Sequence, residues 1–265
     1  MRELDWWDIG GQGLKIPYYQ WPTLLVCVAS ASAVTILFVF AAVGGSLWFS
    51  IPDHSFFNHF IPYLLPVLGT IWLGIFQWSW MTALWHNSLK HCLTFPIQKA
   101  FWQFVAVSLL LLAADLAIVG ARDLLQQLIS NRVSPGRGSS TGHSMIALGT
   151  VLSQAGLHVF LLARLMIWPA YTVARREFVS PIKIWQATSG LLWDFVFLQL
   201  RVQIPVAFIG VILSVITLLI VRSTMIFIAV GAIFAIYGAA AMGAAMLLAY
   251  FEVIGKRQPA LLPAY

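Results

Sequence analysis

Charged residues are scarce in this chain. Asp, Glu, Lys and Arg together make up 9% of its 265 residues, whereas hydrophobic residues make up 60%. A soluble domain carries charge on about a quarter of its residues, so this chain has too few charges to cover a surface that faces water. The composition therefore excludes an ordinary soluble domain and predicts surroundings of lipid. Because backbone groups in lipid must pair within their own segment, we expect an all-α integral membrane protein.

Cysteines and catalytic motifs are also scarce. Cys27 and Cys92 are too few and too isolated for a disulfide framework, and they leave the redox compartment open. The sequence contains neither a Gly-x-Ser-x-Gly elbow nor a His-Glu-x-x-His pair. Its glycine-rich stretch 136–142 lacks the Gly-Lys-Ser/Thr ending of a phosphate loop. We therefore expect no catalytic residues and no cofactor.

The histidines and the basic residues form no recognisable binding pattern either. Potential metal ligands gather in two expected loops, 53–59 and 86–92, but without the helical i, i+4 spacing or the four-ligand set of a known site. The formal net charge of +6 comes from basic residues scattered singly between apolar segments. The sequence thus predicts no metal site and no nucleic-acid partner.

Long uncharged or nearly uncharged runs dominate what is present. Each reaches or approaches the roughly 20 residues that span a bilayer, which predicts a bundle of about six transmembrane helices in one membrane domain, 1–265. The first run reads as a signal anchor, because no small-residue cleavage site follows a short apolar core. A flexible loop is expected at 131–143, from its Gly and Ser content. The expected spans are 23–43, 60–84, 101–119, 145–170, 202–221 and 225–251.

The segment before the fifth span predicts an amphipathic surface helix. Ser180 followed by Pro181 is typical of a helix start, with serine as the cap and proline in the first turn. Ser189-Gly190 should interrupt this helix, and the apolar residues from Leu191 onward then run into the fifth span. A second amphipathic stretch, 121–129, is either an extension of the third span or a helix at the interface.

The distribution of Lys and Arg predicts the orientation. With the N terminus inside, ten basic residues fall on the cytoplasmic side, four fall on the other side, and Arg164 lies within a span. Cytoplasmic loops are enriched in Lys and Arg, so both termini are expected in the cytoplasm. The connection 120–143 argues the other way, because it holds three of the four basic residues on the outer side.

One segment of about 30 residues carries a family resemblance. Arg164, then Trp168-Pro169-Ala170, a basic stretch, and Trp185-Gln-Ala-Thr-Ser-Gly-Leu-Leu-Trp193 follow in that order. This pattern resembles bacterial polytopic proteins related to the membrane domain of glycerophosphoryl diester phosphodiesterase. The resemblance implies the bacterial inner membrane and a bundle of about six helices with a surface helix before the fifth. It does not imply hydrolysis, because the chain lacks that enzyme's soluble catalytic domain.

Four polar residues inside the expected spans are candidate functional residues, since a charge within a bilayer is costly. Asp115 lies roughly 21 Å along the third span, level with His158 and Gln154 of the fourth if the two pack together. These three could form a proton or ion relay, or a single hydrogen bond that fixes helix packing, and we favour packing. Arg164 lies nearer the inner end, where Glu177, Asp194, backbone carbonyls or the membrane surface would satisfy it.

Two further sets of residues point to packing and to lipid. Small residues recur every four positions on the sixth span, at Gly231, Ala235, Ala239 and Gly243. Such a face lets helices approach closely, within the monomer or, less favoured, across a homodimer or with a membrane-protein partner. Arg175, Arg176 and Lys183 are candidates for contact with lipid headgroups.

These features favour a non-enzymatic polytopic protein of the bacterial inner membrane with a structural, assembly or lipid-organising role. The alternative is a transporter or permease subunit for a lipid or small amphiphile, because prolines could break helices near a site. The prolines in question are Pro62, Pro66, Pro169 and Pro205. Against transport, Pro62, Pro66 and Pro205 are expected in first helical turns, where proline does no harm. An intramembrane lipid enzyme is a third reading, which rests on the resemblance alone.

Overall fold

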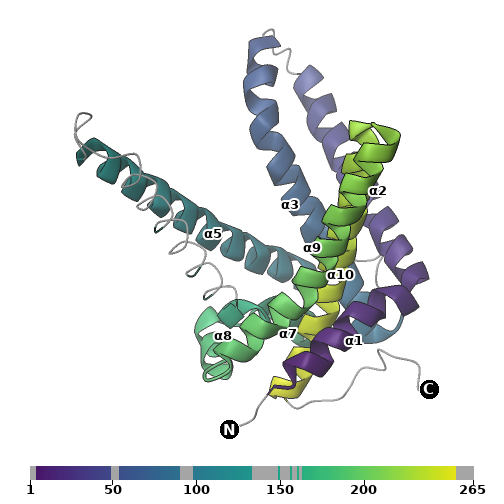
Figure 1. Cartoon of the computed structure of the whole chain (residues 1–265), viewed down its shortest axis with the longest axis vertical. Coiled ribbons are helices and arrows are strands. Elements are labelled where there is room, and N and C mark those ends of the chain that lie inside the picture. The colour runs from purple at the N-terminus through teal and green to yellow at the C-terminus, as the bar shows by residue number, and fades with distance from the viewer. Residues whose placement is uncertain are drawn as a thin grey trace.

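The computed structural model describes residues 4–48, 54–89, 98–132 and 163–254, with 149, 156 and 160. Within the helices some side chains, including that of Asp115, fall outside this description. Every regular element in the described ranges is a helix, which confirms the predicted all-α class (Figure 1). The helices are α1 (Trp6–Tyr19), α2 (Trp21–Trp48), α3 (His54–His86), α5 (Lys99–Arg132), α7 (Trp168–Arg175), α8 (Pro181–Ala187), α9 (Leu192–Val221) and α10 (Thr224–Ile254).

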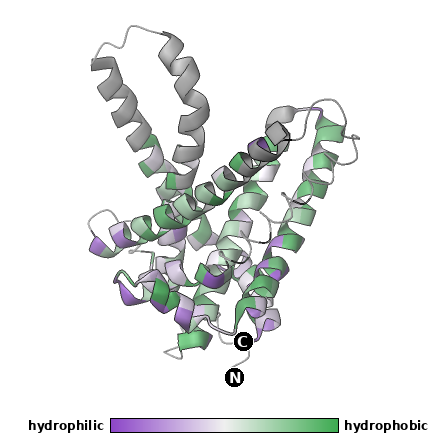
Figure 2. Cartoon of the chain, turned by 90° about the vertical axis from the view of Figure 1, so that its left-hand side faces the viewer, coloured by the Kyte–Doolittle hydropathy of each residue, from purple (hydrophilic) through white to green (hydrophobic). Residues whose placement is uncertain are grey.

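Helices α9 and α10 are each long and apolar enough to cross a membrane. A third candidate is the pair α1 and α2, whose axes meet at 77°. Figure 2 shows hydrophobic residues all round the long helices rather than along one stripe, and helices of this kind lie in lipid or in a protein core. Exposed side chains such as Phe208, Leu219 and Ile220 of α9 fit the first environment. The described residues thus provide two or three candidate spans, and about six remains a prediction.

Helix α1 was not among the predicted elements. It begins after Asp5, whose carboxylate accepts a hydrogen bond from the Asp8 backbone N–H at 3.0 Å. Its buried face, which includes Gly10 and Gly13, packs against α9 and α10. A Cβ atom on Gly13 would lie 2.9 Å from the Cβ of Ala245, so only glycine allows this approach. Tyr237 of α10 completes the contact by donating to the Leu14 carbonyl at 2.6 Å.

Close packing also occurs where α3 meets α10. The Trp80 indole is fully buried and donates to the carbonyl of Ala240 at 2.8 Å. Gly243 faces the same indole. A Cβ atom on Gly243 would lie 3.2 Å from Trp80 Cδ1. Trp78, on the same turn of α3, packs its ring against Phe104 of α5. Small residues on one helix and indoles on the other thus close this end of the bundle.

Several predicted boundaries are confirmed. Ser180 caps α8 with its hydroxyl, which accepts from the Ile182 N–H, and Pro181 is the first residue of the helix. The helix ends at Ala187, and Gly190 then adopts a φ of +85° before α9 begins, a backbone conformation that favours glycine. The stretch 121–129 is an extension, because α5 runs without a break to Arg132.

Other predictions need correction or lie outside the described residues. Pro62 and Pro66 lie inside α3 and Pro205 lies inside α9, rather than in first turns, because these helices begin earlier than the predicted spans. The fourth span, predicted over 145–170, is interrupted by a turn at Met166-Ile167, and α7 begins at Trp168 with a proline in its first turn. The predicted loop 131–143 begins too early, since α5 includes its first two residues. The rest of that loop lies outside the described residues.

Candidate functional site

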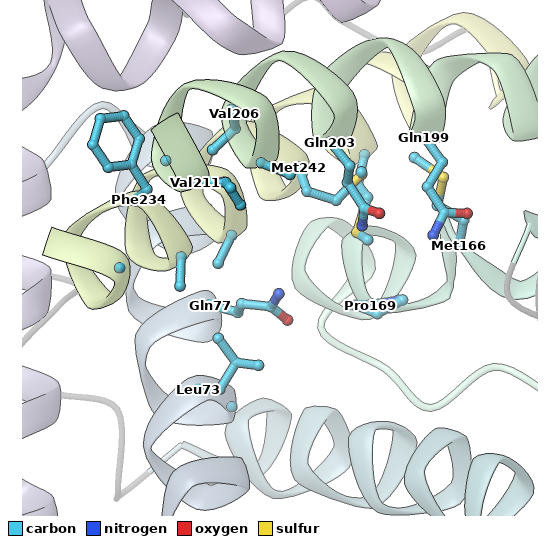
Figure 3. A pocket seen from close by; sticks show the side chains of 18 of the residues that line it. Leu73, Gln77, Met166, Pro169, Gln199, Gln203, Val206, Val211, Phe234 and Met242 are labelled. Atoms are coloured by element: carbon cyan, nitrogen blue, oxygen red, sulfur yellow. The ribbon is translucent and has the colours of Figure 1, made fainter. Parts of the chain in front are cut away.

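The main hollow of the described structure lies between two groups of helices. Its volume is about 840 Å³, within the range of roughly 300–1,000 Å³ typical of ligand sites. Helices α9 and α10 form one wall, and α3, α5 and α7 form the other (Figure 3). We call this hollow the inter-helix cavity. Its described lining residues are Leu73, Gly74, Gln77, Ser108, Leu111, Leu165, Met166, Pro169, Gln199, Gln203, Val206, Ala207, Gly210, Val211, Ser214, Val215, Phe227, Gly231, Phe234, Ala235, Gly238, Ala239, Met242 and Met246.

Close packing of α9 on α10 makes their wall continuous. A Cβ on Gly210 of α9 would lie 2.9 Å from the Cβ of Phe234, and a Cβ on Gly238 of α10 would lie 3.2 Å from Val206. Each helix thus has a glycine that faces a side chain of the other helix, which lets the two backbones approach. The pair ends in a short turn at Arg222, whose φ is 52°.

Three glutamines give the cavity its polar character. Gln199 and Gln203 lie four residues apart on α9, so they share one face of that helix. Gln77 reaches the cavity from α3 (Figure 3). None of the three amides has a hydrogen-bond partner within the described part of the chain. Each amide offers two N–H donors and one carbonyl acceptor, so together they can bind a polar group from more than one direction.

The rest of the described lining is apolar or only weakly polar. It contains no Asp, Glu, Lys, Arg or His. The polar groups other than the glutamines are the hydroxyls of Ser108 and Ser214. An apolar pocket with a few convergent polar groups is the usual form of a small-molecule site. This cavity thus has the chemistry to bind an uncharged or weakly polar molecule.

Arg164 connects the residues that precede α7 to the end of α8, beside the cavity. Its guanidinium donates to the carbonyl of Thr188 at 2.9 Å and to that of Trp185 at 3.2 Å, and it lies 4.5 Å from the centre of the Trp185 ring. The Thr188 hydroxyl returns a hydrogen bond to the Arg164 carbonyl at 3.0 Å. The guanidinium Nε is buried without a partner among the described residues. Backbone carbonyls, one of the predicted alternatives, are therefore its partners.

Of the four predicted intramembrane residues, the structure describes the side chain of Arg164. Gln154 and His158 lie outside the described residues, and so does the side chain of Asp115, whose backbone belongs to α5. The pairing of Asp115 with His158 stays a prediction. Arg164 does not line the cavity, but Leu165 and Met166, which follow it, do.

The small-residue face of α10 divides into two parts. Gly231, Ala235 and Ala239 line the cavity, whereas Gly243 packs on Trp80. The glutamines were not among the residues predicted from sequence. The available signal was Gln199 and Gln203 at helical spacing beside a fully apolar run, together with Gln77 inside the second expected span.

The three predicted lipid-headgroup residues are all exposed. Arg175 and Arg176 end α7, and Lys183 lies on α8 beside Ile182, which is 67% exposed. A hydrogen bond with the Tyr250 hydroxyl raises the pKa of the Arg175 guanidinium. The Arg176 Nη2 lies 2.8 Å from His86 Nε2, which ties the ends of α7 and α3 together.

Comparison with known proteins adds no assignment. Searches with protein-family models, against curated proteins and against solved structures find no match to this chain.

Proposed function

We propose that this chain is a non-enzymatic polytopic membrane protein that holds a lipid or similar amphiphile in the inter-helix cavity, as part of a lipid-organising role. The single observation that carries the proposal is the cavity itself, about 840 Å³ of mostly apolar space with three amides on its walls. An amphiphile is the kind of molecule that matches both parts of this lining.

The described lining supports binding rather than chemistry. General acid–base catalysis needs a group that transfers protons near neutral pH, and the described lining offers amides and hydroxyls only. A nucleophilic serine needs an adjacent base, and neither Ser108 nor Ser214 has one among the described lining residues. The non-enzymatic reading rests on this chemistry.

The surroundings we propose are the bacterial inner membrane, with several crossings and both termini in the cytoplasm. The ten-to-four bias of Lys and Arg supports the orientation, and the family resemblance supports the location. Arg175, Arg176 and Lys183 would then face anionic headgroups of the inner leaflet. In this arrangement membrane lipids are the main partners, and a membrane-protein partner or a second copy is a further proposal.

A transporter subunit for the same amphiphile is the second candidate. The observation that favours it is the length of the cavity. Its lining on α9 extends from Gln199 to Val215, which is roughly 24 Å at 1.5 Å per residue. That distance covers most of the roughly 30 Å of hydrocarbon in a bilayer, as a path for an amphiphile would require.

A photoreactive fatty-acyl probe tests the proposed binding. The protein in lipid nanodiscs is labelled with a diazirine-bearing acyl lipid, and the labelled peptides are mapped by mass spectrometry. We expect labels on the cavity faces of α9 and α10, and a loss of about tenfold or more in Ala235→Phe, because filling a packed site costs roughly 1–3 kcal/mol.

Ala232→Phe is the matched control, since Ala232 is exposed on the same helix and does not line the cavity. Equal labelling of the two variants, or labels confined to the outer faces of the helices, would show that the cavity holds no lipid. Release of a labelled lipid from the opposite leaflet of proteoliposomes, measured separately, decides between binding and transport.

A further inference from the structure

We infer that the occupant of the inter-helix cavity has one long apolar chain and an uncharged head that both donates and accepts hydrogen bonds, such as a hydroxyl-bearing glyceride or a fatty amide. This inference rests on the proposed function, because it concerns the selectivity of the same cavity. It follows from how polar groups are distributed along the cavity and from the absence of charge in its described lining.

The cavity is polar at one end and apolar at the other. Gln199 and Gln203 lie at the end beside α7, close to Met166 and Pro169 (Figure 3). Farther along α9 the lining residues are valine, alanine and glycine, with the Ser214 hydroxyl as the polar group there, and Phe227 of α10 lies at the far end. An amphiphile therefore fits in one orientation, with its head beside α7 and its chain along the groove between the walls.

The lack of charged residues in the described lining determines the charge of the head. A buried charge without a partner costs far more than a buried neutral polar group, and the described lining holds no counter-charge. Arg164 precedes the lining residues Leu165 and Met166 at this end of the cavity, and it already donates to the carbonyls of Thr188 and Trp185. A phosphate or carboxylate head would thus lose water without gaining an ionic partner, whereas a neutral head would not.

The amides also set the hydrogen-bonding character of the head. Gln77, Gln199 and Gln203 lack partners within the described part of the chain, so their donors and acceptors are both available. A head with hydroxyl or amide groups satisfies N–H donors and carbonyl acceptors together. A hydrocarbon without a head would leave these amides desolvated and unpaired, which is unfavourable.

Three oleoyl-length competitors test this selectivity. The compounds 1-oleoylglycerol, its 3-phosphate and 1-octadecene have a neutral head, a charged head and no head on comparable chains. Each competes with the photoreactive acyl probe in nanodiscs, for the wild type and for the double variant Gln199→Leu/Gln203→Leu. Because each compound partitions differently into the nanodisc lipid, the readout is the wild-type-to-variant ratio for each compound.

We expect the double variant to weaken competition by 1-oleoylglycerol about tenfold, as loss of a hydrogen bond predicts, and to leave 1-octadecene unchanged or improved. In the wild type the phosphate should compete at least about tenfold less well than 1-oleoylglycerol. Gln186→Leu is the control, because Gln186 is exposed on α8 and does not line the cavity. The single variant Gln203→Leu, with gel filtration to confirm folding, repeats the test if the double variant misfolds.

The outcomes separate the two proposals. If the phosphate competes as well as 1-oleoylglycerol, or if the glutamine variants keep the preference for the neutral head, the inferred selectivity is wrong while lipid binding stands. If none of the three compounds displaces the probe, and Ala235→Phe labels like the wild type, lipid binding itself fails.

Discussion

The two halves of α10 have similar compositions and opposite surroundings. From Ala240 to Tyr250, which we call the closed half, all residues but Met246 are buried. From Ile226 to Ala239, the open half, none of the residues is buried. Both halves are apolar and rich in glycine and alanine. The difference lies in what meets them. Helices α1 and α3 pack against the closed half, whereas the inter-helix cavity runs along the open half and reaches the closed half at Met242 and Met246.

This contrast shows that a small-residue face does not determine its own partner. In the closed half, Gly243 meets an indole of α3, and Ala245 meets a glycine of α1. Those neighbours match the small residues in shape, so the helices come together. In the open half, Gly231 and Ala235 face a space bounded by glutamines and valines of other helices. The same spacing therefore produces a tight contact at one end and a cavity wall at the other.

The largest effect is expected from placing the same substitution in each half. Gly243→Leu drives a side chain into Trp80 and should destabilise the fold by about 3 kcal/mol, because the indole is fully buried and cannot move away. Gly231→Leu should have little effect, since its Cβ would meet only the Ser214 hydroxyl, at 3.8 Å. Thermal unfolding followed by tryptophan fluorescence measures both. Similar losses in the two variants would remove the distinction between the halves.

A smaller effect is expected from removing the contacts of Arg164, beside the polar end of the cavity. Arg164→Gln removes the hydrogen bonds to Thr188 and Trp185 and should cost about 2 kcal/mol. Hydrogen exchange in α8 and the following turn should rise at the same time. Lys183→Gln, an exposed change on α8, serves as the control and should alter neither quantity. If Arg164→Gln leaves the exchange of α8 unchanged, Arg164 does not hold the end of α8.

The contact of α1 with the closed half can be probed with one methyl group. Gly13→Ala places a Cβ 2.9 Å from Ala245 and 3.1 Å from the Ala241 carbonyl, and should cost about 1–2 kcal/mol. Gly11→Ala meets nothing within 4 Å and should stabilise the helix by up to about 1 kcal/mol. The two unfolding temperatures should therefore move in opposite directions. A Gly13→Ala protein as stable as Gly11→Ala would place α1 away from α10.

The smallest expected effect concerns one hydrogen bond in the closed half. Trp80→Phe keeps most of the ring but removes the donor to the Ala240 carbonyl, at a cost of about 1 kcal/mol. Trp193→Phe, at a position 66% exposed, should change the unfolding temperature far less. Equal shifts would mean that the buried indole N–H contributes nothing specific.

Sequence alone predicted the parts of the fold that depend on local chemistry. The lack of charge predicted an all-α protein for lipid, and Ser180-Pro181 predicted the start of α8. Both signals act within a few residues of where they are found. The turn at Met166-Ile167 was not predicted, because Trp168-Pro169 was read as part of one long apolar run.

Helix α1 and the cavity were missed for a different reason. Gly10, Gly11, Gly13 and Pro17 are poor helix formers, and α1 is stable because Gly10 fits against α9 and Gly13 against α10. The cap at Asp5 was the one local signal for it. The cavity depends on how α3, α5 and α7 are placed relative to α9 and α10, and the sequence of a single helix does not specify that placement. Because both halves of α10 carry small residues, the sequence of α10 does not indicate which half packs against other helices and which half lines the cavity.

The short turn at Arg222-Ser223 has a consequence for how the protein reaches the membrane. The two residues leave α9 and α10 no slack, so these two candidate spans would have to enter a bilayer together as a hairpin. Arg222 would cross at its tip, and a central arginine costs about 2.5–3.5 kcal/mol on an insertion scale. The roughly 60 apolar-rich positions of the pair outweigh that cost many times over. Because α1 packs on both α9 and α10, its complete docking surface exists only once this hairpin has formed.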